Sequence, residues 1–293
     1  MHFKTIPSIL MLFYSYVLFS QNATEIYLFD LFESDSTIVI ANPVNISQNK
    51  GYDNQPFFLE DGSAILFASM RDGQSDIARY EIEGNFRTWI TDTKANEFSP
   101  SIYPRNKKFF TCVRMEDDGT QLLYKYAYKN KEPEVLIPDL KVGYYVWVDK
   151  NKVVSFVLGD EVTLQVSNFK HKIKYPIQQN IGRSLNKIPV KLSVGDKLIS
   201  FISKSHEVSE IYAINPVTSE SVYIVDAVEG SEDMVWTPQG SILMGKDDKI
   251  FKFRSNKDNE WTQILIDSDI VLKNITRMAV SPDGKKIAIV VEE

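Results

Sequence analysis

The chain repeats one pattern of apolar and polar residues along most of its length. A short strand that carries proline or an aromatic residue leads into a tight turn, and a mostly apolar, β-branched strand follows. The turns carry glycine or asparagine, which tolerate the positive φ that a hairpin demands. Six such turns recur about 44 residues apart, at Gly62, Asn106, Asn151, Gly195, Gly240 and Gly284.

Two further strands are predicted after most of these hairpins. The third alternates and is rich in aromatic residues, as in DIARYEI, QLLYKYAY, EIYAINP and KIFKFRS. The fourth is weaker, as in FRTWITD, PEVLIPD, SVYIVDA and WTQILID. Four strands in about 44 residues are typical of a propeller blade. Five complete blades are therefore predicted between about Gln55 and Asp269.

The two ends of the chain supply the two halves of a sixth blade. The C-terminal hairpin, RMAVSPDGKKIAIVVE, lacks a third and a fourth strand, whereas TEIYLFDLF and STIVIANPV near the N-terminus lack a first and a second. Because an unpaired strand edge is a liability, we expect Ile26–Phe29 to pair with Ile287–Val291. The sequence thus predicts an all-β, six-bladed β-propeller closed by its N-terminal strands. The structural alternative is a pair of β-sandwiches, which need no fixed period of this length.

The repeats also resemble a known family. The pattern xxSPDGKxIAxV in residues 279–290, its looser copy LEDGSAILFAS and the strands DIARY and EIYAI that follow resemble the WD-like propeller repeats of TolB-type proteins. The resemblance covers nearly the whole chain after the first twenty residues and implies the propeller fold. The chain leaves no room for the separate N-terminal α/β domain that TolB itself carries.

The first twenty residues differ from the rest of the chain. Lys4 precedes an apolar run from Ile6 to Phe19, and Ser20 is a small residue before Gln21. This pattern predicts a secretory signal peptide over residues 1–20 and a single propeller domain over residues 21–293. The alternative is a short membrane anchor, although the run is shorter than the roughly 18 residues that a spanning helix needs.

Composition narrows the function classes. The net charge is −6 and the isoelectric point is near 5.3. An acidic chain lacks the basic footprint of nucleic-acid binding, so we expect no nucleic-acid partner. Cys112 is the single cysteine, so no intramolecular disulfide can form, and its apolar surroundings indicate a core position.

The predicted channel mouth is the place to look for a binding site. In a propeller the first strand of each blade lines the central channel, and the loop entering that strand contributes to one mouth. Counting back from each turn residue gives a ring of polar and charged candidates: Asn54, Glu97, Tyr144, Asn186, Glu232, Asp233 and Arg277. Arg183 joins them from the non-repetitive stretch QQNIGRSLNKIP, which we interpret as a loop before a first strand. Arg183 could form a bidentate contact with a ligand carboxylate, stack on an aromatic ring or form an ion pair with the acidic loop EGSED.

The acidic members of this ring suggest a metal hypothesis. Glu97 and Glu232, with Asn54 and Asn186, offer the oxygen ligands that calcium takes. The alternative is that such residues cap strand ends and pair with neighbouring cations. Nucleophilic catalysis has little support, because His171 and His206 lie outside the ring and no Gly-x-Ser-x-Gly motif exists.

Together these features favour an exported, non-enzymatic scaffold, periplasmic or secreted. Its expected partner is a protein, a peptide or a small polar ligand, and no cofactor is expected unless calcium binds. The alternative is a calcium-dependent propeller hydrolase or lactonase with its site at the channel mouth. Carbohydrate binding through Trp147 and Trp236 is a third hypothesis, but their shared repeat position indicates packing between blades.

Overall fold

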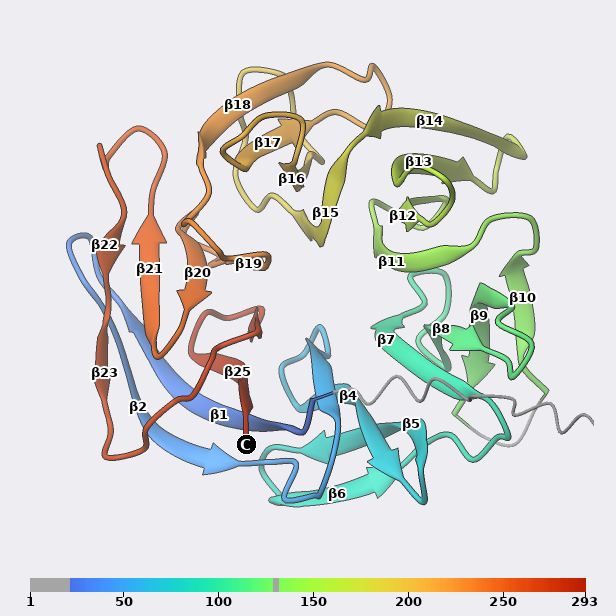
Figure 1. Cartoon of the computed structure of the whole chain (residues 1–293), viewed down its shortest axis with the longest axis horizontal. Coiled ribbons are helices and arrows are strands. Elements are labelled where there is room, and N and C mark those ends of the chain that lie inside the picture. The colour runs from blue at the N-terminus through green and yellow to red at the C-terminus, as the bar shows by residue number, and fades with distance from the viewer. Residues whose placement is uncertain (1–21, 129–131) are drawn as a thin grey trace, which may run out of the picture.

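The computed structural model describes residues 22–128 and 132–293, which fold into strands β1–β25 and no helix. These strands form six sheets around a central axis, with β7, β11, β15 and β19 nearest to it (Figure 1). The predicted all-β, six-bladed propeller is confirmed. The predicted signal peptide, residues 1–20, lies outside the described residues. Within those residues, no helix of sufficient length and apolar character to cross a membrane is found.

Five blades are antiparallel sheets of four strands each. The first contains β3 (Asp53–Phe58), β4 (Ala64–Arg71), β5 (Gln74–Glu81) and β6 (Phe86–Trp89). The second contains β7 (Asn96–Ile102), β8 (Phe109–Met115), β9 (Gln121–Ala127) and β10 (Glu134–Ile137). The third contains β11 (Val142–Trp147), β12 (Lys152–Val157), β13 (Thr163–Asn168) and β14 (Ile173–Gln179). The fourth contains β15 (Ile181–Lys187), β16 (Ile199–Ser203), β17 (Glu210–Ile214) and β18 (Ser221–Asp226). The fifth contains β19 (Met234–Trp236), β20 (Ile242–Lys246), β21 (Lys249–Phe253) and β22 (Thr262–Gln263).

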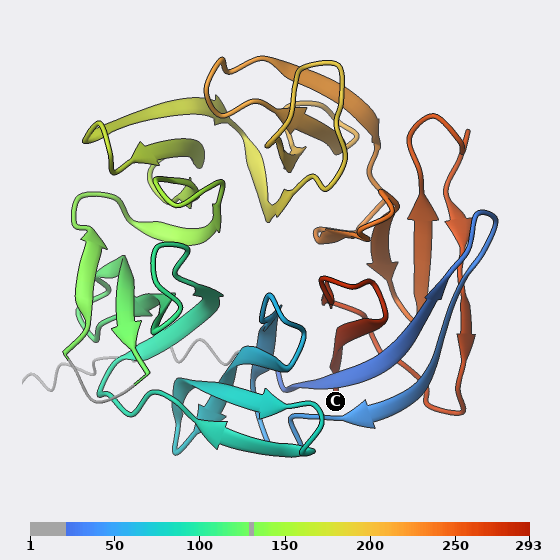
Figure 2. The same ribbon diagram turned by 180° about the vertical axis from the view of Figure 1, so that it is seen from behind.

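The sixth blade joins the two ends of the described chain. It contains β1 (Thr24–Glu33), β2 (Ile38–Asn45), β23 (Leu265–Asp267), β24 (Arg277–Val280) and β25 (Lys286–Glu292), in the order β23-β2-β1-β25-β24. Ile26 lies opposite Val290 and Phe29 opposite Ile287, which is the pairing that the sequence predicts. Figure 2 shows the blue N-terminal strands beside the red C-terminal strands in one sheet. Neither β1 nor β25 is therefore an open edge.

One predicted fourth strand is divided between two blades. The stretch WTQILID was expected to complete the fifth blade, but only Thr262–Gln263 pairs with β21. Leu265–Asp267 instead adds to β2 as a parallel fifth strand of the closing blade. Ile264, between the two short strands, is buried, so its side chain anchors the crossing of the chain from one blade to the next.

The inner strand of the fourth blade also differs from its prediction. The sequence pattern places Arg183 in a loop that precedes this strand. In the structure the strand is β15, Ile181–Lys187, and Arg183 belongs to it. The reason is that an inner strand faces a polar channel, so it need not show the apolar alternation by which a strand is found.

Extra residues interrupt the pairing of four inner strands. The register of β3 shifts between Asn54 and Phe57, and that of β7 shifts between Phe98 and Ser101. Similar shifts occur in β11 after Val142 and in β15 after Ile181. A bulge bends its strand and re-aims the side chains beside it. The bulges therefore decide which residues of each inner strand face the axis.

The hydrophobic core lies between adjacent blades rather than at the axis. Trp147 and Trp236 are both buried in clusters of this kind, as their shared repeat position predicts. Their indole nitrogens donate to Thr111 Oγ1 at 3.1 Å and to Ser200 Oγ at 2.9 Å. Cys112 is fully buried in an apolar cluster, where burial raises the pKa of its thiol well above the usual value.

Candidate functional site

A channel of about 530 Å³ runs along the propeller axis and is lined by the inner strand of every blade. Its volume lies in the range of known ligand pockets. At one end it is lined by Tyr144, Arg183, Asp233 and Arg277, and this end is called the arginine end below. The other end is formed by residues near the hairpin turns, including Glu60, Pro104 and Lys187.

Two bulged strands place polar groups on the channel wall that the sequence pattern did not identify. Gln55 and Ser99 line the channel, and both have positive φ, 59° and 51°. The Ser99 backbone N–H donates to Gln55 Oε1 at 2.6 Å, which links neighbouring inner strands. Gln55 and Ser99 hold equivalent positions in consecutive repeats, so the bulge itself recurs with the repeat.

The most highly charged part of the channel is an arginine–aspartate–arginine cluster. Arg183 donates to Asp233 Oδ2 from Nε at 2.9 Å and from Nη2 at 2.6 Å. Arg277 Nε lies 3.6 Å from the other oxygen, Asp233 Oδ1. This distance is longer than a hydrogen bond, and the buried Nε has no hydrogen-bond partner among the described residues. One carboxylate thus serves two guanidinium groups, and one of the two is incompletely bonded.

Aromatic side chains support the second guanidinium. Arg277 lies over the Tyr144 ring, with its Cζ 5.0 Å from the ring centroid, in a cation–π contact. Burial opposes the charge of Arg277, but Asp233 and Tyr144 outweigh it and hold its pKa above the usual value. Burial also raises the pKa of the Tyr52 hydroxyl, so Tyr52 stays protonated beside the cluster. The cluster is therefore cationic throughout the physiological pH range.

A second cavity of about 210 Å³ adjoins the arginine end. It shares Arg183, Asp233, Arg277 and Met278 with the channel, so the charged cluster is a wall between the two cavities. Its remaining lining residues come from the entries to β19 and β24 and from the end of β20: Gly230, Ser231, Glu232, Gly245, Lys246, Asp247, Asn274, Ile275 and Thr276.

Five of the predicted mouth residues line the channel: Tyr144, Arg183, Asn186, Asp233 and Arg277. The predicted contact between Arg183 and the acidic loop is present, as the pair with Asp233. Asn186 donates to the Met234 carbonyl oxygen at 2.9 Å, so its amide ties β15 to β19. Glu232 lines only the smaller cavity and accepts a hydrogen bond from Lys204, which lowers the pKa of Glu232.

Asn54 and Glu97 line neither cavity. Asn54 is the last paired residue before the bulge of β3, and Glu97 precedes Phe98, the last paired residue before the bulge of β7; Gln55 and Ser99, inside the two bulges, line the channel instead. Asn54 Oδ1 accepts from the Gln55 backbone N–H at 2.8 Å. A count at a fixed distance from the turn residue does not detect the bulge. The extra residue in the bulge shifts the pattern, so the counted side chain points to the other face of the strand.

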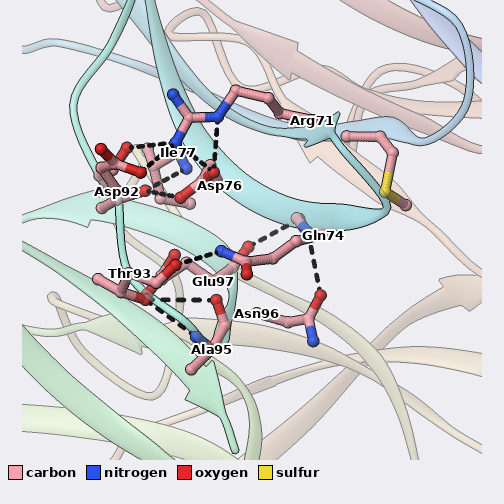
Figure 3. A network of polar contacts seen from close by, with 12 residues as sticks. Arg71, Gln74, Asp76, Ile77, Asp92, Thr93, Ala95, Asn96 and Glu97 are labelled. Carbon is pink, nitrogen blue, oxygen red and sulfur yellow. Dashed lines mark hydrogen bonds and ion pairs between the residues drawn. The ribbon is translucent and has the colours of Figure 1, made fainter.

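Glu97, in β7, is fully buried beside Thr93 (Figure 3). Its Oε1 accepts hydrogen bonds from Thr93 Oγ1 and from Tyr126 Oη, and its Oε2 has no partner among the described residues. Burial, with a smaller contribution from the charge of Asp76, raises the pKa of Glu97 to about 7. Glu97 is thus a buried carboxyl of the blade interface and not a group of the channel mouth.

Asp53 is a second buried carboxyl, which the sequence pattern did not identify. It precedes Glu97 by one repeat, is fully buried, and accepts a hydrogen bond from Ser69 Oγ on Oδ1. Its Oδ2 has no partner within residues 22–128 and 132–293. Burial raises the pKa of Asp53 to about 7, and the charge of Glu25 adds to the effect.

The structure does not bring together the residues proposed for calcium. Glu97 is buried away from both cavities, whereas Glu232 is bonded to Lys204 at the smaller one. Across the described part of the chain, no group of three or more His, Cys, Asp or Glu side chains is arranged to hold a metal ion. His206 lies in an exposed turn against Glu210 and lines neither cavity.

The fold and this site define a class: a six-bladed β-propeller with a polar axial channel and an arginine pair at one end. A protein described as TolB from Agrobacterium tumefaciens has the same fold, with a TM-score of 0.69 and 13% identity over 93% of this chain and 99% of that chain. TolB from Acinetobacter baumannii has a TM-score of 0.56 and 13% identity, over 92% of this chain and 64% of that chain. The predicted TolB-type propeller is confirmed at the level of fold.

The same fold occurs in a protein with a different description. A structure described as a gluconolactonase has a TM-score of 0.56 and 9% identity, over 83% of this chain and 89% of that chain. A protein described as a probable DNA polymerase, from Ascobolus immersus, is 22% identical to this chain over 198 residues. The match covers 63% of this chain but only 15% of that protein. No protein-family model matches the sequence.

Proposed function

We propose that the protein is a non-catalytic binding propeller of the cell envelope, and that its ligand or partner binds at the arginine end of the channel. The carrying observation is the cluster of Arg183, Asp233 and Arg277, which lines both cavities; in it, the buried Nε of Arg277 has no hydrogen-bond partner among the described residues. Buried polar groups are almost always bonded, so an unbonded one beside a cavity indicates a place for a partner.

The polar groups of the channel favour binding over catalysis. The described lining of the channel contains charged side chains, hydroxyls and amides, but no histidine or cysteine; its charged residues are Glu60, Arg183, Lys187, Asp233 and Arg277. Asp233 lies between two arginines, with Arg183 bonded to its Oδ2 and Arg277 Nε 3.6 Å from its Oδ1, so both carboxylate oxygens face guanidinium groups of the wall. A nucleophile–base pair of the kind that covalent catalysis uses is not formed by these lining residues.

Photo-crosslinking in living cells that make the protein tests this proposal. A photoreactive residue is placed at Asn274, which is exposed and lines the smaller cavity, and in a control protein at Val217. Val217 is 60% exposed in the turn between β17 and β18 and lines neither cavity. Intact-mass spectrometry of the purified protein should show a defined adduct, either a peptide or a small molecule, when the photoreactive residue is at position 274 and not when it is at position 217. The same adducts from both positions, or none from Asn274, would refute the proposed site.

Location in the envelope is a separate part of the proposal. It is supported by the apolar run of residues 6–19 in the sequence and by the likeness of the fold to TolB structures. Fractionation of cells that make the untagged chain, followed by mass spectrometry of its N-terminus, tests it. We expect the protein outside the cytoplasm with Gln21 as its first residue; a cytoplasmic chain that retains residues 1–20 would refute this part.

The calcium-dependent hydrolase remains the competing hypothesis, and a titration distinguishes the two. A rise in melting temperature with added calcium that is lost in Glu232→Gln would favour the hydrolase. The binding propeller predicts no such rise, because Glu232 is already bonded to Lys204 and belongs to no group of three or more His, Cys, Asp or Glu side chains arranged for a metal among the described residues.

A further inference from the structure

The charged wall between the two cavities carries more positive than negative charge. Arg183 and Arg277 are both cationic, and Asp233 is the only carboxylate that contacts either of them among the described residues. Arg183 takes both hydrogen bonds to Asp233, so its pairing is nearly complete. The surplus charge therefore belongs to Arg277, which a bound anion could neutralise.

The surplus positive charge is confined to this wall, because the molecule as a whole is acidic. The net charge of the chain is −6, which weakens nonspecific attraction of anions. Glu232 and Asp247 also line the smaller cavity, but Glu232 is bonded to Lys204, and neither acid forms an ion pair with Arg277 among the described residues. An anion that binds at this wall therefore does so through the contacts at the wall and not through a general field.

The position of Arg277 makes it reachable from both cavities. Its side chain is 14% exposed, lines both the channel and the smaller cavity, and is held from one face by the Tyr144 ring. The guanidinium presents its donors in a rigid, planar fork, and this fork matches the two oxygens of a carboxylate. Because the ring and Asp233 already position it, little side-chain entropy remains to be lost on binding.

We propose that the wall formed by Arg183, Asp233 and Arg277 is a receptor for one carboxylate group of the ligand, which Arg277 binds as the principal donor. The proposal rests on the proposed binding function of the arginine end and names the group that this end recognises. Asp233 acts as a positioning residue that holds both arginines.

A carboxylate fits this wall better than a phosphate. A carboxylate brings one negative charge, which equals the single surplus positive charge of the cluster. A phosphate would bring nearly two charges at neutral pH and would place the second one beside Asp233, where like charges repel. The carboxylate can belong to a small acid or to the acidic side chain or C-terminus of a peptide, because the channel has room for the rest of either ligand.

The nitrogen without a hydrogen bond is itself the probe for a direct test. The protein is labelled with ¹⁵N, and the Nε–Hε signal of Arg277 is assigned by its loss in Arg277→Lys. Sodium propionate is then titrated, with sodium chloride at equal ionic strength as the reference. We expect a saturable shift of the Arg277 signal with propionate and none with chloride. No shift, or the same shift with chloride, would overturn the proposal.

A matched pair of variants separates recognition from general charge. Arg277→Gln should weaken propionate binding, followed on the Arg183 Nε–Hε signal, by about tenfold or more, because a hydrogen bond to a charged group is lost. Arg105→Gln removes the same charge at an exposed position outside both cavities, where Nε donates to the Lys150 carbonyl oxygen, and should leave the affinity unchanged. Equal effects of the two variants would overturn the proposal. If Arg277→Gln fails to fold, the wild-type titration decides.

Three further ligands identify the source of the carboxylate. N-acetylated trialanine with a free C-terminus binds more tightly than propionate if a peptide is the ligand, and its C-terminal amide does not bind. Equal affinity of propionate and the free-acid peptide indicates a small acid. Tighter binding of inorganic phosphate than of propionate overturns the assignment to carboxylate. A partner captured from Asn274 without any shift by propionate or peptide would leave the proposed function intact and refute this receptor alone.

Discussion

Replacing Asp53 by asparagine tests how strongly the blade interface opposes a buried negative charge. The pKa of Asp53 is raised from 3.8 to about 7, first because the side chain is buried and also because Glu25 lies nearby. The asparagine side chain has nearly the same shape and keeps an oxygen that can accept the Ser69 hydroxyl. The substitution therefore removes the ionisation and little of the packing.

The sign of the effect follows from proton linkage. The folded-state pKa lies above the unfolded value, so Asp53 contributes stability that is fully present below about pH 4 and lost as pH rises through about 7. A difference of about three pKa units corresponds to about 4 kcal/mol at most. Between pH 4.5 and 8 we expect wild type to lose about 2–4 kcal/mol of unfolding free energy relative to Asp53→Asn.

Urea denaturation at pH 4.5, 6 and 8 measures this difference. The free energy of unfolding is extrapolated for both proteins, and equal slopes show that the unfolded states are comparable. Any cost of the new amide donor is independent of pH and cancels when one pH is compared with another. The reasoning is refuted if the difference between the proteins does not change with pH, or if wild type gains stability relative to the variant as pH rises.

The matched control is Asp118→Asn in the turn between β8 and β9. Asp118 is exposed, and the backbone N–H of Thr120 donates to it, which lowers its pKa. The pH dependence of its stabilising effect therefore has the opposite sign. Asp118 stabilises the folded state above its unfolded pKa, and this contribution is lost as pH falls through its lower folded-state pKa. Glu97→Gln should behave as Asp53→Asn does, because burial also raises the pKa of Glu97 to about 7.

Three further substitutions test the closure and the packing of the ring. Arg254→Met leaves Glu33, whose side chain is 1% exposed, without its cationic partner, and should lower the unfolding free energy by about 3–5 kcal/mol in urea titrations. Gly245→Ala places a Cβ 2.4 Å from Ile275 Cγ2 and should destabilise by about 1–3 kcal/mol, measured in the same way. Trp236→Phe removes a buried hydrogen-bond donor and part of a ring, and should cost about 1–3 kcal/mol, seen as a lower melting temperature.

Arg254→Met and Gly245→Ala each have a control in the same chain. Lys257→Met breaks an exposed ion pair with Asp35 and should change the unfolding free energy by less than about 1 kcal/mol; a loss as large as that of Arg254→Met would contradict the role of burial. Gly159→Ala meets only an ordinary contact at 3.4 Å and should be nearly neutral. If it costs as much as Gly245→Ala, the crowding at Ile275 is not the cause.

The strands and their period could be predicted because they depend on local patterns. Second strands such as β4 and β25 are buried on both faces, so they appear in the sequence as continuous apolar runs beside a glycine turn. The pairing of Ile26 with Val290 could be predicted from the same runs, since each chain end lacks what the other supplies.

The channel wall was less accessible to sequence analysis. The inner strand of the fourth blade, β15, was interpreted as a loop because its residues alternate in no apolar pattern. Asn54 and Glu97 were placed at the mouth because the extra residues in β3 and β7 carry no recognisable signal. A bulge is a property of two paired strands, whereas the count was made along one.

A ring of repeated four-strand units that closes by joining its ends can be predicted from the residues alone, because hydrophobic periodicity and turn residues act over a few neighbouring positions. Which polar groups meet depends instead on how different blades pack. Arg183 and Asp233 are 50 residues apart and pair because adjacent blades bring two inner strands together. Asp53 and Thr24 are 29 residues apart and come from different blades, yet the Thr24 hydroxyl donates to the Asp53 carbonyl oxygen at 2.8 Å. Such contacts depend on the packing of whole blades, and no local pattern encodes them.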